Sequence, residues 1–231
     1  MRLRGLVLAF LVVGLIPLAA QPAQADQIID FIGGAGGTVN YAGAAAALIG
    51  TGLNISFVQG LMTPLNAQSG SCPANCQPII GGALNFMTGM FTGIDGGGNY
   101  NFAGGGNITI TGLGPGGSGV LGPLVLGSFL GAQVTQLGVL RLFLSTGPDS
   151  KDPLLLAFYG LTGAAFQFSG AAFLNNFTIN PITGGFTSNG FSVDIANVVV
   201  PEPATLAMLG AGLIGLAFIL RRSLGALGNH A

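Results

Sequence analysis

Charged side chains and histidine are scarce in this sequence. Only 6% of its 231 residues are charged, and the one histidine, His230, is next to the last residue. Ordinary soluble domains contain about 25% charged residues. Between residues 26 and 200 there are six acids and only two bases, Arg141 and Lys151. This segment has no basic patch that could neutralise phosphates, so we expect no nucleic-acid partner.

The lack of histidine also limits catalysis. A serine or cysteine nucleophile needs a neighbouring base, and His230 lies beyond the apolar C-terminal run. Residues 112–117 match G-x-G-x-x-G, but Pro115, Gly119 and Pro123 prevent the helix that nucleotide binding requires. We therefore expect no catalytic, cofactor-binding or metal-binding residues and no enzyme activity.

Four aspartates leave two alternatives open. Two of Asp95, Asp149, Asp152 and Asp194 could form the carboxylate pair of a hydrolase. Asp149 and Asp152 also flank Lys151, where a loose Ca²⁺ site is conceivable. Because all four acids fall in predicted turns or at strand ends, solvated side chains are the favoured interpretation.

Tryptophan is absent, and there are only three tyrosines, Tyr41, Tyr100 and Tyr159. Aromatic rings with a polar tip are the side chains that suit stacking against sugars. Their small number weakens a carbohydrate-binding interpretation without removing it.

The sequence has only two cysteines, Cys72 and Cys76. In an exported chain such a pair predicts a local disulfide. The closed loop is short, so its stabilisation should stay below the roughly 3 kcal/mol expected for a 15-residue loop. Two thiols without a nearby histidine do not make a zinc site.

The N-terminus is typical of a secretion signal. Arg2 and Arg4 precede an apolar run, and Ala23-Gln24-Ala25 has the small-x-small pattern of a cleavage site. A retained membrane helix is the alternative, and the prolines near the end of the run argue against it. We expect residues 1–25 to be removed and the mature chain to begin at Asp26.

Short alternating segments separated by glycine-rich turns dominate residues 26–199. Residues 107–111 are one clear case, and no long amphipathic helix occurs. This pattern predicts an all-β domain, an antiparallel β-sandwich or jelly-roll-like fold, flanked by an N-terminal signal helix and a C-terminal transmembrane helix. Because no strict repeat is present, a β-solenoid is less favoured.

Four local assignments follow from composition. The polar residues 147–153 predict a loop, and the apolar residues 154–161 predict a buried strand. Gly170 separates two predicted strands. Asn189-Gly190 predicts a turn.

The last predicted strand is Phe191–Val199. Its alternation predicts that Phe191, Val193 and Ile195 face inward and that Asp194 faces outward.

An unusual stretch follows that strand. Pro201-Glu202-Pro203 cannot lie inside a helix, because the prolines fix φ and lack donors. The uncharged run 204–220 would span roughly 25 Å as a helix, slightly short of a roughly 30 Å hydrocarbon core. Arg221 and Arg222 then stop the segment and favour the cytoplasmic side.

Residues 200–222 resemble the PEP-CTERM sorting signal of bacterial surface and exopolysaccharide-associated proteins. The resemblance rests on Pro201-Glu202-Pro203, the start at residues 204–206, the glycine-rich run and the pair Arg221-Arg222. It implies recognition by an exosortase, a membrane-embedded enzyme that cleaves near the Pro-Glu-Pro. The tail 223–231 departs from the pattern, since such signals usually end after the basic pair. The middle of the chain is diffusely similar to Gly- and Phe-rich β-domains found upstream of such signals.

The expected organisation is a signal peptide (1–25), a mature β-domain (26–199), a sorting signal with a transmembrane helix (200–222) and a cytoplasmic tail (223–231). The expected role is that of an exported structural protein of the cell surface or extracellular matrix. It would pass through an inner-membrane-anchored precursor and associate with exopolysaccharide. The alternatives are a carbohydrate-binding module, an aspartate-dependent hydrolase, an ordinary membrane anchor and a eukaryotic GPI signal.

Overall fold

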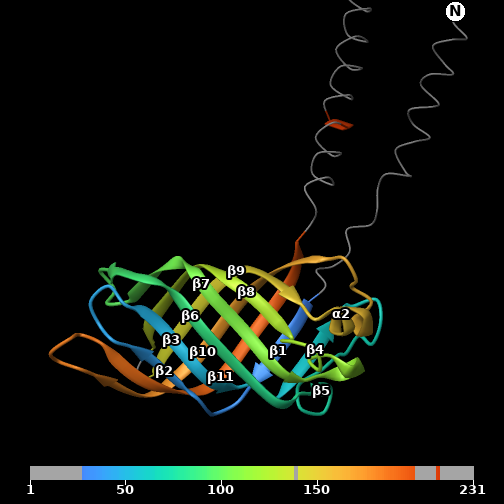
Figure 1. The fold of residues 1–231 in the computed structure, drawn as a ribbon, viewed down its shortest axis with the longest axis horizontal. Coiled ribbons are helices and arrows are strands. Elements are labelled where there is room, and N and C mark those ends of the chain that lie inside the picture. The colour runs from blue at the N-terminus through green and yellow to red at the C-terminus, as the bar shows by residue number, and fades with distance from the viewer. Residues whose placement is uncertain (1–27, 138–139, 201–211, 214–231) are drawn as a thin grey trace, which may run out of the picture.

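The computed structural model describes residues 28–137, 140–200 and 212–213. Most of them lie in antiparallel strands (Figure 1). The strands are β1 (Ile28–Gly33), β2 (Thr38–Tyr41), β3 (Ala47–Asn54), β4 (Phe57–Leu61), β5 (Gln77–Pro78), β6 (Ile80–Ile94), β7 (Tyr100–Leu113), β8 (Val125–Leu137), β9 (Leu140–Lys151), β10 (Ala165–Ile179) and β11 (Phe186–Val200). Two short helices interrupt them, the 3₁₀ turn η1 (Pro115–Gly117) and α2 (Pro153–Tyr159).

All eleven strands belong to one sheet, in the order β10-β9-β8-β7-β6-β3-β2-β11-β1-β4-β5. Because β10 also pairs with β11, the sheet closes on itself. The all-antiparallel prediction is confirmed. The expected two-sheet sandwich is replaced by a single closed sheet. The strands β6 to β11 have 12 to 15 residues and several carry bulges, so twist and bending bring the β10 edge against β11.

Strand β11 is the junction of the sheet. It pairs with β10 along almost its whole length. On its other side, residues 186–189 pair with β2 and residues 193–198 pair with β1. The strands β4 and β5 then extend the sheet beyond β1. β11, the last strand of the domain, therefore pairs with the first strand, β1, and with β10.

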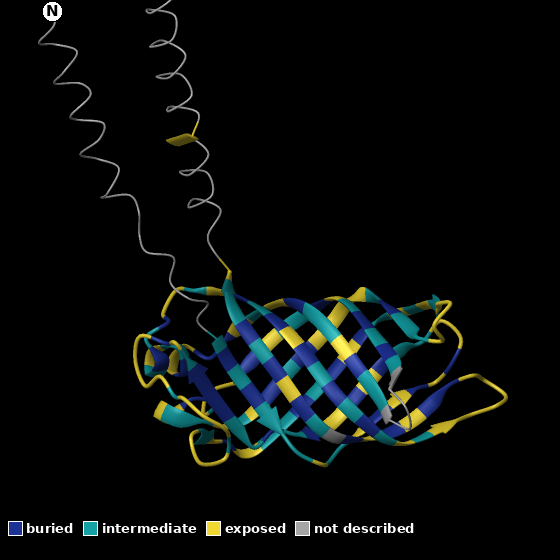
Figure 2. Ribbon diagram, turned by 180° about the vertical axis from the view of Figure 1, so that it is seen from behind, coloured by how far each residue is buried: buried dark blue, intermediate teal, exposed yellow. Residues whose placement is uncertain are grey.

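The interior is filled by a single cluster of apolar side chains. Buried residues alternate with exposed and half-buried ones along the strands (Figure 2). The rings of Phe86 and Phe143 stack with centroids 4.6 Å apart, and Phe129 meets both edge-on. Each fully buried phenylalanine contributes about 1.5–3 kcal/mol. Gly50 is required beside this stack, because a Cβ there would collide with the ring of Phe86.

The predicted strand at 154–161 is wrong, since these residues form helix α2. Asp152 caps its N-terminus by accepting a hydrogen bond from the Leu154 amide at 2.7 Å, and Pro153 follows at the first helical position. Gly160 ends the helix in the left-handed region at φ 73°. Leu155 and Tyr159 are its buried residues. These capping residues were present in the sequence, but the apolar run 154–161 led to the prediction of a strand.

Three further local predictions are wrong for one reason. Residues 147–151 belong to β9 instead of a loop, Gly170 lies inside β10, and Asn189-Gly190 lies inside β11. Each stretch has the composition of a turn, but its strand neighbours on both sides supply the backbone hydrogen bonds. Pairing between distant segments therefore overrides local propensity.

The predicted facing of the last strand is confirmed where the structure describes it. Val193 and Ile195 are buried, and Asp194 is exposed. The side chain of Phe191 is outside the described part. The predicted 112–117 loop is confirmed from residue 114 onward, where the only element is the short turn η1, but Gly112 and Leu113 are the last residues of β7.

Several predicted segments lie outside the described residues. They are the signal peptide with Ala23 and Ala25, the tripeptide Pro201-Glu202-Pro203, and Arg221 and Arg222. The transmembrane run 204–220 falls almost wholly there too. Among the helices in the described ranges, none has the length and apolar character needed to cross a membrane.

Candidate functional site

The predicted sorting segment begins where β11 ends. Val200, the last residue of β11, pairs with Ala165 at the start of β10. Two residues earlier, Val198 pairs with Ile28 at the start of β1. The first described residue and the start of the sorting segment are therefore close together, at one end of the sheet (Figure 1). Processing at either end would act at the same edge of the domain.

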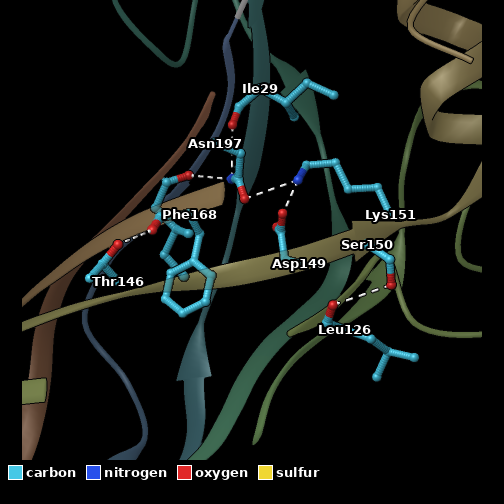
Figure 3. Close-up of polar contacts among 9 residues, drawn as sticks. Ile29, Leu126, Thr146, Asp149, Ser150, Lys151, Phe168 and Asn197 are labelled. Atoms are coloured by element: carbon cyan, nitrogen blue, oxygen red, sulfur yellow. Dashed lines mark hydrogen bonds and ion pairs between the residues drawn. The ribbon is translucent and has the colours of Figure 1, made fainter. Parts of the chain in front are cut away.

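A polar cluster lies inside the sheet near this end (Figure 3). The ammonium of Lys151 donates to Oδ2 of Asp149 at 2.7 Å and to Oδ1 of Asn197 at 3.0 Å. Both charged side chains have 0% exposure. The Lys151 nitrogen also lies 4.0 Å from the centroid of the Phe166 ring. Asp149 and Lys151, expected to be solvated in a loop, are thus an enclosed ion pair.

Burial disfavours the charged form of both partners. It lowers the pKa of Lys151 to about 8, while the nearby carboxylate opposes the change. It also raises the pKa of Asp149, against the effect of the Lys151 charge. Oδ1 of Asp149 is buried and has no hydrogen-bond partner. The pKa values of Lys151 and Asp149 are therefore closer together than in a solvated pair, so a proton is shared more evenly between the two groups.

Asn197 is held rigidly on the other side of Lys151. Its Nδ2 donates to the carbonyls of Ile29 and Ile195, each at 2.9 Å, and the residue has 0% exposure. The cluster therefore connects β9, β11 and β1 (Figure 3). Asn197 was not among the site residues predicted from the sequence. Its inward orientation could nevertheless have been predicted, because it continues the inward alternation of Val193 and Ile195.

A pair of acidic residues lies on the opposite face of the sheet. Asp30 of β1 and Asp194 of β11 lie beside one another across the β1–β11 pairing. Burial and the charge of Asp194 raise the pKa of Asp30 to about 7. Sequence analysis did not select Asp30, because only the strand register brings it near Asp194.

The remaining two candidate aspartates have separate structural tasks. Asp95 accepts hydrogen bonds from the Asn99 side chain and from the Gly97 and Asn99 amides in the β6–β7 turn. The Asn99 contacts lower its pKa. Asp152 caps α2 and accepts from the Gly119 amide at 2.9 Å. The four acids proposed for a hydrolase are therefore divided among a turn, the interior, a helix cap and the outer face.

The tyrosines are used mainly in packing. Tyr41 and Tyr159 are 3% and 0% exposed. The Tyr41 hydroxyl donates to the Ala44 carbonyl at 2.6 Å, and the Tyr159 hydroxyl reaches Gln68 at 3.3 Å. Tyr100 is half-buried against Tyr41 and Phe186. None of the three presents a fully open ring for stacking.

The predicted disulfide is present between Cys72 and Cys76, with Cα atoms 5.3 Å apart. It lies in the loop between β4 and β5. The same loop is tied to β4 by the Gln59 side chain, which donates to the Gly70 carbonyl at 2.8 Å. Within the described ranges, no group of three or more His, Cys, Asp or Glu side chains could hold a metal ion.

Comparison with known proteins finds one feature. No curated protein and no solved structure matches the chain. Residues 199–223 match the model of the PEP-CTERM protein-sorting motif. The match begins at Val199, the last but one residue of β11, and contains the Pro-Glu-Pro, the apolar run and the two arginines. The chain therefore carries a PEP-CTERM protein-sorting motif at the end of its β-domain.

Proposed function

We propose that the chain is an exported structural protein of the bacterial cell surface or extracellular matrix, associated with exopolysaccharide and sorted by an exosortase. The single observation that supports this most is the sorting motif at residues 199–223. The motif is typical of exported, exosortase-processed proteins. In this proposal, residues 204–222 hold a precursor in the inner membrane until the enzyme cuts near Pro201-Glu202-Pro203.

The attachment of the motif to β11 supports this order of events. β11 is hydrogen-bonded on both sides up to the edge of the sheet. The domain can therefore fold completely while its C-terminus is still attached to the membrane. Residues 201–203 lie outside the described part, and from the sequence we expect Pro201 and Pro203 to favour an extended backbone, the form that a processing enzyme can reach.

A passive role agrees best with the side chains. The interior is filled by packed apolar residues, and Tyr41 and Tyr159 are buried. A carbohydrate-binding module and a hydrolase remain the alternatives, with less support, because the stacking rings are enclosed and the four aspartates are separated. Pull-down with the native polysaccharide would separate binding from a passive role. Single Asp→Asn variants would reveal a hydrolase through loss of activity.

The test replaces Pro201, Glu202 and Pro203 with alanine in a host that has an exosortase. Wild type should lose the segment from near Pro201 and leave the membrane fraction. The variant should still be exported but accumulate at full length, because residues 205–222 are unchanged. The measurement is the mass of the mature protein in each cell fraction.

A matched control is Ile182→Ala, a change at a 92% exposed residue in the β10–β11 turn. It should be processed as the wild type is. Equal trimming of wild type and the alanine variant, or trimming of neither, would overturn the role of the tripeptide.

A further inference from the structure

The interior cluster brings together the groups needed to make an amide bond. Lys151 supplies a primary amine, and Asn197 supplies a carboxamide. The Lys151 nitrogen is 3.0 Å from Oδ1 of Asn197, one bond away from the carbonyl carbon Cγ. Asp149 contacts the same nitrogen at 2.7 Å. Attack requires Nζ to approach Cγ to about 3–3.5 Å. The contact with Oδ1 places the amine beside that carbon, so the approach needs only a side-chain movement.

We propose that Lys151 and Asn197 become joined by a covalent amide bond between their side chains, with release of ammonia. The modification would form within the folded domain and would need no cofactor. It does not depend on the sorting step, so either proposal can fail without the other.

The steps balance without another reactant. Asp149 first takes a proton from the Lys151 ammonium, which leaves a neutral amine. Nζ then attacks Cγ of Asn197, and the Cγ–Nδ2 bond breaks. The second proton of the amine passes through the Asp149 carboxyl to the departing Nδ2, which leaves as ammonia. The products are the amide, ammonia and a protonated Asp149.

The surroundings favour each step. Desolvation of a lysine in an apolar site makes its amine a nucleophile near neutral pH, as the lowered Lys151 pKa indicates. A buried carboxyl with a raised pKa is suited to remain protonated after the lysine charge has disappeared. Water, which would compete for Cγ, is kept away because the cluster has no exposed side-chain surface.

The hydrogen bonds of Asn197 also prevent its carboxamide from rotating and hold it in an orientation suited to the reaction. The carbonyls of Ile29 and Ile195 hold Nδ2, so the carboxamide is fixed with Oδ1 toward Lys151. The same carbonyls can stabilise the positive charge that develops on Nδ2 as it takes up a proton. A group that stabilises the charge developing in a transition state accelerates that step.

The decisive measurement is made on the wild-type protein purified from exporting cells. Trypsin cuts after an unmodified lysine, but the amide would block the cut after Lys151. We expect one peptide that runs from residue 142 past Asn197, with a mass lower by one ammonia than its sequence requires. A second digestion with chymotrypsin should yield a branched peptide containing both Lys151 and Asn197. Normal tryptic cleavage after Lys151 together with an unmodified Asn197 would overturn the proposal.

Ammonia is also lost when asparagine cyclises with the next backbone amide, and Asn189-Gly190 is a site where this could occur. The Lys151→Arg variant separates the two reactions, because it keeps a positive charge but has no primary amine. Both the ammonia loss and the branched peptide should disappear in this variant. Persistence of the ammonia loss would assign it to cyclisation and overturn the amide.

The Asp149→Asn variant tests the proton transfer. It keeps the size of the side chain and leaves both reacting groups in place. We expect the branched peptide to fall to a trace of the wild-type amount, at equal circular dichroism. Formation at the wild-type extent would overturn the part given to Asp149.

Discussion

Acidic side chains on the two faces of the sheet near β11 have opposite electrostatic surroundings. On the inner face, Asp149 has a cation 2.7 Å away and no contact with solvent. On the outer face, Asp30 has another acid, Asp194, as its neighbour. Both bases of the mature region are directed inward, since Arg141 pairs with the buried Leu174 and lies over the Phe177 ring. Among the described residues, both cations thus point inward and one of them is enclosed with an acid, whereas Asp30 and Asp194 lie together on the outer face.

The largest effect is expected from removing the inner acid. In the domain before the Lys151–Asn197 amide forms, Asp149→Ala leaves the Lys151 ammonium without its carboxylate in an apolar interior. This typically costs about 3–5 kcal/mol, or about a third of a domain's stability. Urea unfolding followed by circular dichroism measures the free energy. In a Lys151→Met background the same change should cost clearly less, because no charge remains to be paired. Equal costs in both backgrounds would mean that the inner pair does not interact.

The next effect compares neighbouring residues of β11. Ile195→Ala removes a side chain that is 2% exposed, and such a change costs about 2–5 kcal/mol. Asp194→Asn, one residue earlier on the outer face, should cost less than about 0.5 kcal/mol. Thermal unfolding of both variants measures the difference. If the two were equally damaging, the assignment of the two faces would be wrong.

A third effect concerns the outer acid and depends on pH. The pKa of Asp30 rises from 3.8 to about 7 on folding, so the folded state binds the proton more tightly between these values. The free energy of unfolding should therefore fall as pH rises from about 4 to about 7, and stay level above that. Asp30→Asn should remove this fall and be more stable than wild type at pH 8, with no difference near pH 3.

Unfolding measured across this pH range tests the expectation. Asp194→Asn is the matched control, because it removes the like charge and should move the fall toward lower pH. A stability that rises between pH 4 and pH 7 in the wild type, and not in Asp30→Asn, would contradict the raised pKa.

The sequence was sufficient to predict the strand class, several turns and the sorting motif, because these depend on local patterns. Alternation fixed the inward side of Val193 and Ile195. It failed at residues 147–151, where aspartate, lysine and serine indicated a loop although the stretch is a strand whose two charged side chains are enclosed. Only the pairing of β9 with β8 and β10 makes that burial possible.

The contacts that define the inner cluster come from distant parts of the chain. Lys151 and Asn197 are 46 positions apart, and Asn197 and Ile29 are 168 apart. No local pattern contains such a register. The pairing of β11 with β1 and β2 was unpredictable for the same reason. By contrast, α2 could have been predicted from Asp152, Pro153 and Gly160, had capping been weighed against the apolar run.

The attachment of the sorting segment to β11 has a mechanical consequence. A force that pulls on Val200 along the strand acts on a ladder of hydrogen bonds to β10 and β1, arranged parallel to one another and at right angles to the pull. Such bonds must shear together, whereas bonds at a strand edge peel apart one at a time. Asn197 is three residues from the point of traction and is tied to β9 and β1. Tension carried by the tail would therefore act first on the strand pairs of β11 and on the contacts of Asn197.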